Sequence, residues 1–588
     1  MSEKAMLNAR EIPVVKEVDV LVVGGGYAGF GAAMCAARNG AKTMLVEQQS
    51  ALGGLVTMGY VALTFSYIEG VAYELFHVLK SINGVTGRFV DVEKTKVVLE
   101  QMLLKEKVQI LYNTSVVDAI VENNTITGAV IFNKGGFQAI KAKRVIDASG
   151  DGDVSAYAGV PFEVGFPEMN NYNQASSLVM HIGNVDMEKY NALGDTIAFW
   201  ENKIKAAVDN GEYPYMIDRR INWLVRVPGR DPKHQELYIC YAHSRNCRCL
   251  DGEDLTRQLI EQRQQCQWTM EFCKKNIPGF EGAWLIDTAP MLGVRDSRRI
   301  MCEYKLTADD LINGARFDDA IMRAMHAFDA HHPVDVGHVK HVMRPNEKGE
   351  MVRRYVDPGF WREVPYRALV TLKIDNLLVA GRNFSADFMA QSGNRLVLEC
   401  LNMGQAAGTA AALSIKDGVT PRALDAQKLR KRLVEMGINL LEPPKYGAGN
   451  ASTGLPSPVG GSGRNCPISP SAILVSGFMF TPVHSSTSGH QNTAAANGLG
   501  AGRRPATGRS RVTGQISGEK RRQPFIQQRR MLLDMKQATQ HRQCIPAGCG
   551  RELQPRPRAF STPRFARASA RSLPGSPECP RTQRQSMR

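Results

Sequence analysis

A glycine-rich loop between an apolar strand and a small-residue helix constrains this chain most. Val18–Val23 is a short apolar run typical of a buried parallel strand, and Gly24, Gly26 and Gly29 follow it in the spacing G-x-G-x-x-G. The first glycine permits a tight turn, the second lets the backbone approach a pyrophosphate, and the third lets the helix pack closely on the sheet. The helix N-terminus then offers free N–H groups to phosphate. The pattern predicts a Rossmann-type nucleotide-binding unit.

An acidic residue closes the second strand of this unit and selects among dinucleotides. The stretch over 42–46 predicts that strand, and Glu47 follows it, 23 residues after Gly24. A carboxylate at this place accepts hydrogen bonds from a ribose 2′-hydroxyl and repels the 2′-phosphate of NADP. NAD and FAD are therefore favoured.

Three further stretches carry a resemblance to one superfamily. They are EQQSALGGLVTMG at 47–59, VIDASGDGDVSAYAGVPFEVG at 145–165 and NLLVAGRNFSADFMAQSGNRLVLECLNMGQAAGTAAA at 376–412. Together with the glycine loop, they resemble FAD-binding proteins related to the flavoprotein subunit of fumarate reductase and succinate dehydrogenase, and more distantly glutathione reductase. GVRDSRRI at 293–300 is similar to a characteristic stretch of one branch. The likeness runs from about residue 18 to residue 440.

The resemblance implies FAD as the cofactor. The histidine that attaches covalently to FAD in succinate dehydrogenases has no counterpart near Gly54, so noncovalent FAD is expected. The stretch over 404–408 is expected to begin a helix whose N-terminus faces the flavin pyrimidine. The glycine loop and the resemblance together assign the cofactor to Gly24, Gly26, Gly29, Glu47, Gly53, Gly54, Val117, Gly150, Asp151, Gly381, Arg382, Gly404, Gln405 and Ala406.

Four residues are candidates for the chemistry. Arg295 and Arg395 are expected to contact a carboxylate or the flavin, because a guanidinium grips a carboxylate with two parallel hydrogen bonds. Arg298 and Arg382 are candidates for the same kind of contact. Asp329 and His331 are expected to form an acid–base pair in which the aspartate sets the histidine tautomer. The alternative is that the arginines only pair with buried acids and that the histidine only packs in the core.

Two groups of metal-ligand residue types were weighed against ordinary packing. Five histidines lie between positions 326 and 341, but their spacing is irregular. Cys240, His243, Cys247 and Cys249 are of the residue types that bind zinc, although the strand predicted over 237–241 would bury the first of them as a small apolar residue. No C-x₂-C pair exists, which argues against an iron–sulfur cluster. We therefore predict no metal site.

These features predict an α/β protein of discontinuous domains. A Rossmann-type, glutathione-reductase-like FAD-binding domain would comprise residues 14–155 and 363–440. An α+β substrate or cap domain over 156–362 would be inserted between its two parts. A disordered C-terminal tail over 447–588 would follow, because its composition offers little apolar surface to bury. This tail is either a natural extension or sequence never selected to fold.

The charge of the chain is concentrated in that tail. The net charge is +16, yet residues 451–588 contain 21 Lys and Arg against 4 Asp and Glu, which leaves 52 basic and 53 acidic residues in the rest. A body without a basic excess does not have the electrostatic footprint of a nucleic-acid-binding domain. Nucleic-acid binding is therefore expected only through the tail.

The functional prediction is an FAD-dependent oxidoreductase that transfers a hydride between a small organic substrate and noncovalent FAD, with an electron acceptor or donor still to be identified. One alternative is a flavin monooxygenase or halogenase, and another is a nucleic-acid-binding protein acting through the Arg-rich tail. No apolar run reaches the ~18 residues that a membrane span needs, and the first 16 residues lack an apolar signal segment. A cytoplasmic protein without membrane partners is expected, and its substrate and oligomeric state stay open.

Overall fold

The central sheet is built around the strand that precedes the glycine loop. The computed structural model describes residues 10–64, 67–213, 221–356 and 361–441, and the predicted tail lies outside them. The strand order is β5-β2-β1-β8-β7-β6, and β21 also pairs with β8. The strands are β1 (Val14–Val23), β2 (Thr43–Val46), β5 (Gln109–Leu111), β6 (Ser115–Glu122), β7 (Thr125–Asn133), β8 (Gly136–Asp147) and β21 (Leu377–Val379). Every pairing among β5, β2, β1, β8 and β21 is parallel, as a Rossmann-type unit requires.

One strand of this sheet serves two purposes. The sequence pattern predicts two strands, over 137–142 and 144–148, but the structure contains a single strand, β8. Its first half pairs antiparallel with β7, and its last three residues pair parallel with β21. The antiparallel hairpin β6–β7 is therefore continuous with the nucleotide-binding sheet. The predicted break was wrong because β8 keeps pairing with β1 throughout this stretch.

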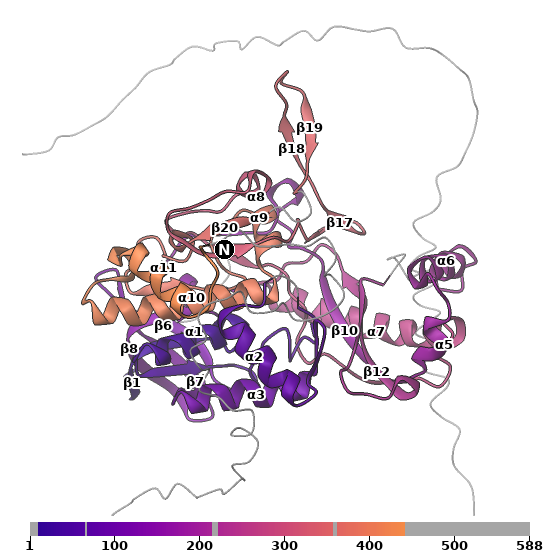
Figure 1. Cartoon of the computed structure of the whole chain (residues 1–588), viewed down its shortest axis with the longest axis horizontal. Helices are drawn as coiled ribbons and strands as arrows, with labels where there is room; N and C mark the ends of the chain where they lie inside the picture. The colour runs from indigo at the N-terminus through magenta and orange to yellow at the C-terminus, as the bar shows by residue number, and fades with distance from the viewer. Residues whose placement is uncertain (1–9, 65–66, 214–220, 357–360, 442–588) are drawn as a thin grey trace, which may run out of the picture. The chain divides into compact units, whose positions relative to one another are not determined.

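Helices α1 (Tyr27–Arg38) and α10 (Val397–Lys416) pack backbone to backbone, although they lie near opposite ends of the described chain (Figure 1). A Cβ at Gly404 would collide with the carbonyl oxygen of Ala28, and one at Gly408 would collide with that of Ala32. The glycines of α10 are therefore needed for helix packing. The expectation that residue 404 begins this helix was wrong, because α10 starts at Val397.

The other helices complete both regions of the molecule. On the side of the central sheet lie α2 (Gly70–Ser81), α3 (Val92–Lys105), α4 (Asp153–Tyr157) and α11 (Ala426–Glu435). The segment between β8 and β21 adds α5 (Met187–Asn191), α6 (Thr196–Asp209), α7 (Gly252–Asn276) and α8 (Ala308–Asn313). Helix α9 (Phe388–Asn394) contacts α8 and the strand β16 (Ala330–His331). Among the described residues, no helix is both long enough and apolar enough to cross a bilayer.

A second, antiparallel sheet forms in the segment between β8 and β21. Its order is β11-β12-β10-β13, and α7 packs against β10 and β12 (Figure 1). The strands are β10 (Ser176–Val185), β11 (Trp223–Arg226), β12 (Gln235–Ser244) and β13 (Trp284–Thr288). The predicted strand over 237–241 lies in β12, and Cys240 is fully buried there.

The other strands of the described chain form separate two-stranded pairs. The pairs are β3 (Val85–Thr86) with β4 (Phe89–Val90), β9 (Phe162–Val164) with β14 (Arg298–Ile300), β15 (Ala320–Ala324) with β20 (Arg362–Pro365), β16 (Ala330–His331) with β17 (His338–Val339), and β18 (Val342–Pro345) with β19 (Met351–Arg354). The β18–β19 hairpin projects from the body of the protein (Figure 1). The β16–β17 pair places two histidines opposite each other, which matters for the site below.

Candidate cofactor and substrate site

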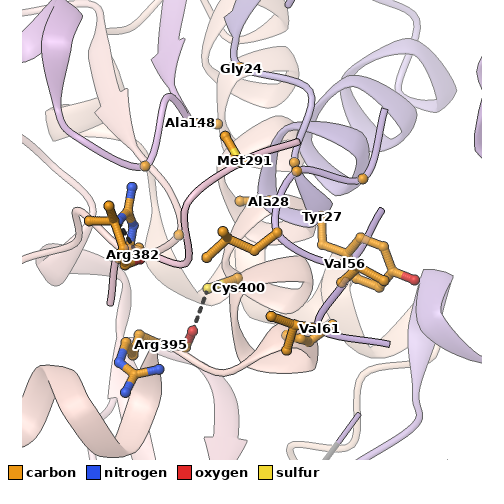
Figure 2. Close-up of a pocket in the computed structure, with 18 of the residues that line it drawn as sticks. Gly24, Tyr27, Ala28, Val56, Val61, Ala148, Met291, Arg382, Arg395 and Cys400 are labelled. Carbon is orange, nitrogen blue, oxygen red and sulfur yellow. Dashed lines mark hydrogen bonds between the residues drawn. The ribbon is translucent and has the colours of Figure 1, made fainter. Parts of the chain in front are cut away.

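One cavity lies against the carboxyl ends of the parallel strands. Its wall includes the loop after β1 at Gly24, the end of β2 at Glu47, the turn after β8 at Gly150, and the turn after β21 at Gly381. This edge is where open α/β sheets bind their ligands. Figure 2 shows Gly24 at one end of the drawn residues and Arg395 at the other, with side chains from distant segments between them.

The three loop glycines serve different purposes. Gly24 has a φ of +96°, and a Cβ there would press on the backbone of Ala148. A Cβ at Gly29 would collide with the carbonyl oxygen of Gly24. At Gly26, by contrast, the nearest atom to an added Cβ is the Cα of Gly54, 3.9 Å away. The first and third glycines therefore permit the fold, whereas the second leaves open space on the cavity side.

Glu47 holds the loop in place. Its Oε2 accepts a hydrogen bond from the backbone N–H of Gly25 at 2.5 Å, and its Oε1 accepts one from that of Gln49 at 2.7 Å. Burial raises the pKa of this carboxyl group, and the two backbone hydrogen bonds oppose that shift. Each carboxylate oxygen can accept more than one hydrogen bond, so Glu47 keeps capacity for a ligand hydroxyl in the cavity that it lines.

Most of the residues assigned to the cofactor line this cavity, and six do not. Those in the wall are Gly24, Gly26, Glu47, Gly53, Gly54, Gly150, Gly381 and Arg382. The described wall does not include Gly29, Val117, Asp151, Gly404, Gln405 or Ala406.

Three of the six exceptions are explained by their strand register or their own hydrogen bonds. The strand β6 has an irregular register between Val116 and Asp118, and Val116 lines the cavity in place of Val117. Asp151 binds Arg382 through its Oδ1, at 2.7 Å from Nη2. Gln405 accepts a hydrogen bond from the backbone N–H of Val71 and is completely buried.

Helix α10 faces the cavity with its N-terminal residues, seven positions before the start that the sequence predicted. Leu396 and Val397 begin α10 and line the cavity, whereas Gly404 and Ala406 lie deeper in the helix, against α1. The sequence did not reveal this start because Leu396 is an N-cap residue without a side-chain hydrogen bond. The positive end of the helix dipole thus lies at the cavity through residues that sequence patterning overlooked.

All four residues predicted to carry the chemistry line the same cavity. They are Arg295, Asp329, His331 and Arg395. Arg395 donates from Nη2 to the backbone oxygen of Asp329 at 2.9 Å and to its Oδ2 at 3.3 Å. Arg295 donates from Nη1 to the backbone oxygen of Ala175 at 2.6 Å. Two guanidinium groups therefore border a cavity whose opposite wall is the glycine loop.

The histidine of the predicted acid–base pair has a different neighbour. Asp329 Oδ1 lies 3.6 Å from Nε2 of His338, and that same nitrogen lies 3.1 Å from Nε2 of His331. Burial and the neighbouring Arg295 hold the pKa of His331 well below its usual range, and burial lowers the pKa of His338 to about 4. Both imidazoles are therefore neutral near pH 7. His338 thus lies between the two residues that the sequence paired directly.

The GVRDSRRI stretch supports these side chains from behind. Asp296 is fully buried and accepts hydrogen bonds from Asn173 Nδ2 at 3.0 Å and from the backbone N–H of Gln174 at 2.6 Å. The side-chain oxygen of Gln174 in turn accepts hydrogen bonds from the backbone N–H of His331 at 3.1 Å and from Arg395 at 3.2 Å. The stretch therefore positions residues at the cavity besides contributing Arg295.

Sequence reasoning overlooked the apolar part of the wall and did not place His243 or His338 beside His331. Apolar or weakly polar residues in the wall include Trp223. Figure 2 shows five more of them, Tyr27, Val56, Val61, Met291 and Cys400. His243 stacks on His331 with ring centroids 5.5 Å apart, and the ring centroid of His338 lies 4.1 Å from that of His331. Met291 lies just before the GVRDSRRI stretch and so had a signal nearby. The histidines at 326–341 were visible as a group in the sequence, but strand pairing decides which of them lie together.

The fold and the cavity together define a dinucleotide-binding α/β protein. The chain belongs to the FAD dependent oxidoreductase family, whose sequence profile matches residues 19–433. It is therefore an FAD-binding oxidoreductase, as the glycine motifs predicted.

Curated relatives match only part of the chain. Thiamine thiazole synthase of Methanococcus vannielii is 32% identical over 147 residues, which are 23% of this chain and 56% of that protein. The thiamine thiazole synthase of Methanococcus aeolicus is 30% identical over 145 residues, or 23% and 55%. The chain thus spans about half the length of the curated relatives it matches.

Solved structures with a similar chain path cover more of the chain at low identity. A geranylgeranyl bacteriochlorophyll reductase-like protein from Thermoplasma acidophilum is 14% identical, covers 72% of this chain and 84% of its own, and has a TM-score of 0.38. The myxobacterial chondrochloren halogenase is 10% identical, covers 71% and 78%, and has a TM-score of 0.35.

Proposed function

We propose that this oxidoreductase transfers a hydride between noncovalent FAD and a small organic anion. One observation carries the proposal: Arg295 and Arg395 border the same cavity as the glycine loop, from segments far from that loop in the sequence. A guanidinium at 9% exposure is poorly hydrated, so an anionic group of a substrate would replace solvent as its partner at Arg295. The substrate would thus lie between the arginines and the cofactor.

The residues present fit FAD at the glycine end. The open space at Gly26, beside Gly54, is a cradle that a side chain would fill and that suits a pyrophosphate. Glu47 would accept from the ribose, and Gly381 with the N-terminus of α10 would border the isoalloxazine. When bound, FAD would supply a two-electron acceptor or donor to the cavity.

The proposal divides the labour between two parts of the chain. Residues 14–155 and 363–440 would hold the cofactor, and the inserted segment 156–362 would supply Arg295 and the Asp329–His331 group. Arg295 would orient the anion, and the Asp329–His331 group would take up or deliver the proton that accompanies the hydride. A relation to the fumarate reductase and succinate dehydrogenase branch is part of this proposal, and it is supported by the GVRDSRRI stretch.

Anaerobic flavin bleaching tests the proposal. The holoenzyme would be mixed with 2-hydroxy acids, amines and, after photoreduction, enoates, while the flavin absorbance near 450 nm is followed. At least one carboxylate substrate should bleach or reoxidise the flavin, and its methyl ester should react far more slowly. Equal rates with acid and ester would contradict the anion site. A compound that only accelerates reaction of the reduced flavin with oxygen would favour a monooxygenase or halogenase instead.

The same assay separates roles within the wall. Arg295→Ala should slow bleaching by the acid but not by the ester, because only the acid has a charge to pair. Arg298→Ala is the matched control, because Arg298 pairs with Asp153 at 2.8 Å and is absent from the described wall of the cavity. Equal slowing in both variants would indicate a structural role for Arg295.

A further inference from the structure

We infer that Asp329, His331 and His338 bind one divalent first-row transition metal ion at the substrate end of the cavity. The chemical role of this ion rests on the proposed function, which it deepens: with the ion bound, Asp329 and His331 would serve as its ligands and no longer as the proton acceptor or donor assigned to them above. The binding of the ion can be measured independently. The sequence did not predict the site, because ligands at positions 329, 331 and 338 follow no regular spacing.

Strand pairing explains how these side chains meet. His331 ends β16 and His338 begins β17, and the two are direct partners across this antiparallel pair. Side chains of directly opposed residues lie on the same face of a sheet and approach closely. Asp329 immediately precedes β16, at the start of the β16–β17 hairpin. Its carboxylate therefore lies near the two imidazoles.

The distances fit a common ion. One carboxylate oxygen and one nitrogen from each imidazole all lie within 4.8 Å of one another. The two Nε2 atoms are 3.1 Å apart, and Asp329 Oδ1 lies 3.6 Å from the nearer of them. Ligands bound at about 2.0–2.2 Å from one ion are separated by roughly 3–3.5 Å. The pair of nitrogens therefore has the separation of ligands that share an ion, the carboxylate oxygen lies just beyond that range from His338, and the three ligand atoms stay within 4.8 Å of one another.

The ligand set indicates the kind of metal. Two histidines and one carboxylate with open positions are typical of Fe²⁺ sites that bind substrate or oxygen directly. Asp329 and His331 both line the cavity, so the open positions would face the proposed substrate. An anion with two suitably placed oxygens, such as a 2-hydroxy or 2-oxo acid, would complete the coordination while Arg295 pairs with its charge.

Partners around the three side chains hold them in orientation. Arg395 donates to Oδ2 of Asp329, which leaves Oδ1 directed at His338. Gln174 fixes the backbone of His331, and His243 stacks on its ring. Such outer partners are a regular part of metal sites, and their loss typically weakens metal binding about 10–100-fold.

The competing explanation is a hydrogen bond between two neutral imidazoles, for which 3.1 Å is also an ordinary distance. The nearby Arg295 and Arg395 would repel a cation. Two carboxylates, those of Asp329 and the buried Asp296, offset part of the positive charge of Arg395. The two explanations differ in one measurable quantity, the amount of metal that the folded protein retains.

The experiment measures metal bound to the flavin-containing protein. The chain would be stripped with a chelator, loaded anaerobically with Fe²⁺, desalted and analysed by plasma mass spectrometry, with flavin content and melting temperature measured on the same samples. We expect about one Fe²⁺ per chain. Asp329→Asn and His338→Gln should weaken binding by at least the 10–100-fold that loss of an outer partner causes. His341→Ala should retain the metal, because its ring packs on Tyr355 outside the cluster.

The outcomes are distinct. Absence of bound Fe²⁺ in the folded wild-type protein, or equal Fe²⁺ content in His338→Gln and His341→Ala, would overturn the inference. If His338→Gln does not fold, Asp329→Asn and a competition titration of the wild-type protein against a fluorescent chelator decide the question. Substrate bleaching by a metal-free enzyme would leave the proposed function standing without the metal. Specific metal binding without bleaching by any anion would support the metal site and refute the proposed function.

Discussion

Backbone atoms form most of the wall at one end of the cavity, and side chains form it at the other end. At the glycine end, the wall is mostly backbone: the Gly24–Gly26 loop, Gly53 and Gly54, and the turn at Gly381. At the other end, the wall is made of charged and imidazole side chains held by buried partners, such as Asp296 behind Gln174. A backbone wall recognises what all dinucleotides share, whereas a side-chain wall can recognise one substrate. The glycine loop therefore identifies the family, whereas the substrate depends on the arrangement of the side chains.

The largest effect is expected when a side chain is added where α10 packs on α1. Gly404→Val should prevent stable folding, because its branched side chain would collide with the backbone of Ala28. Overpacking usually costs ~1–3 kcal/mol, and a backbone collision at a rigid contact should lie at or above the upper end. Thermal and urea unfolding would measure the loss. A stable Gly404→Val protein that lacks flavin would instead restore the view that residue 404 faces the cofactor.

Gly26→Val should have the opposite signature. Its Cβ meets no protein atom closer than 3.9 Å, so the variant should fold with a melting temperature near that of the flavin-free wild-type protein. The new side chain would occupy the proposed pyrophosphate cradle, so flavin content should fall to a small fraction. The ratio of flavin to protein absorbance measures this. Normal flavin content in the variant would place the pyrophosphate elsewhere.

At the side-chain end, turnover should fall without loss of cofactor. Arg295→Ala should slow turnover of the anionic substrate about 10²–10³-fold, the usual effect of removing one positioned charge donor from a water-poor site. Flavin content should stay within error of the wild-type value, because Arg295 is remote from the glycine loop in the sequence and contacts Ala175. Parallel loss of flavin and of stability would show that the arginine is part of the core instead.

Glu69, the N-cap residue of α2, should affect stability through pH. Burial raises the pKa of Glu69 to about 7 from its usual 4.5, although Asn439 donates a backbone hydrogen bond to it at 2.9 Å. Between these two pH values the folded protein binds more protons than the unfolded chain, so the free energy of unfolding should fall as pH rises from about 4.5 to 7. Glu69→Gln should make this decline shallower. Melting temperatures of both proteins at pH 5, 6, 7 and 8 provide the check, and identical slopes would contradict the assignment.

The sequence predicted the parts of the fold that local patterns determine. Gly24, Gly26 and Gly29 lie at a turn whose backbone requirement is local, and Glu47 lies at the end of a strand with a clear apolar pattern. The start of α10 was missed because its N-cap residue, Leu396, has an apolar side chain that makes no capping hydrogen bond. Val117 was placed one residue away from the lining residue by a register irregularity in β6.

The candidate site was harder to predict because its contacts are between distant residues. All four chemical candidates reached the cavity, since the resemblance placed them in segments near the cofactor. Their mutual geometry followed from tertiary contacts, such as Arg395 with Asp329 and Gln174 with His331. His338 became visible only through its pairing with His331 in a two-residue strand, which is too short to leave a periodic signal.

The packing of α10 on α1 also sets the order in which this protein can mature. The helix that follows the glycine loop is synthesised early, but the surface that it packs against arrives only when residues 397–416 leave the ribosome. At typical synthesis rates of about 5–20 residues per second, roughly 20–75 s separate Ala28 from Gly404. Until then the turn at Gly381 and the start of α10 are missing from the cavity, so flavin capture should be a late event that follows synthesis of nearly the whole described chain.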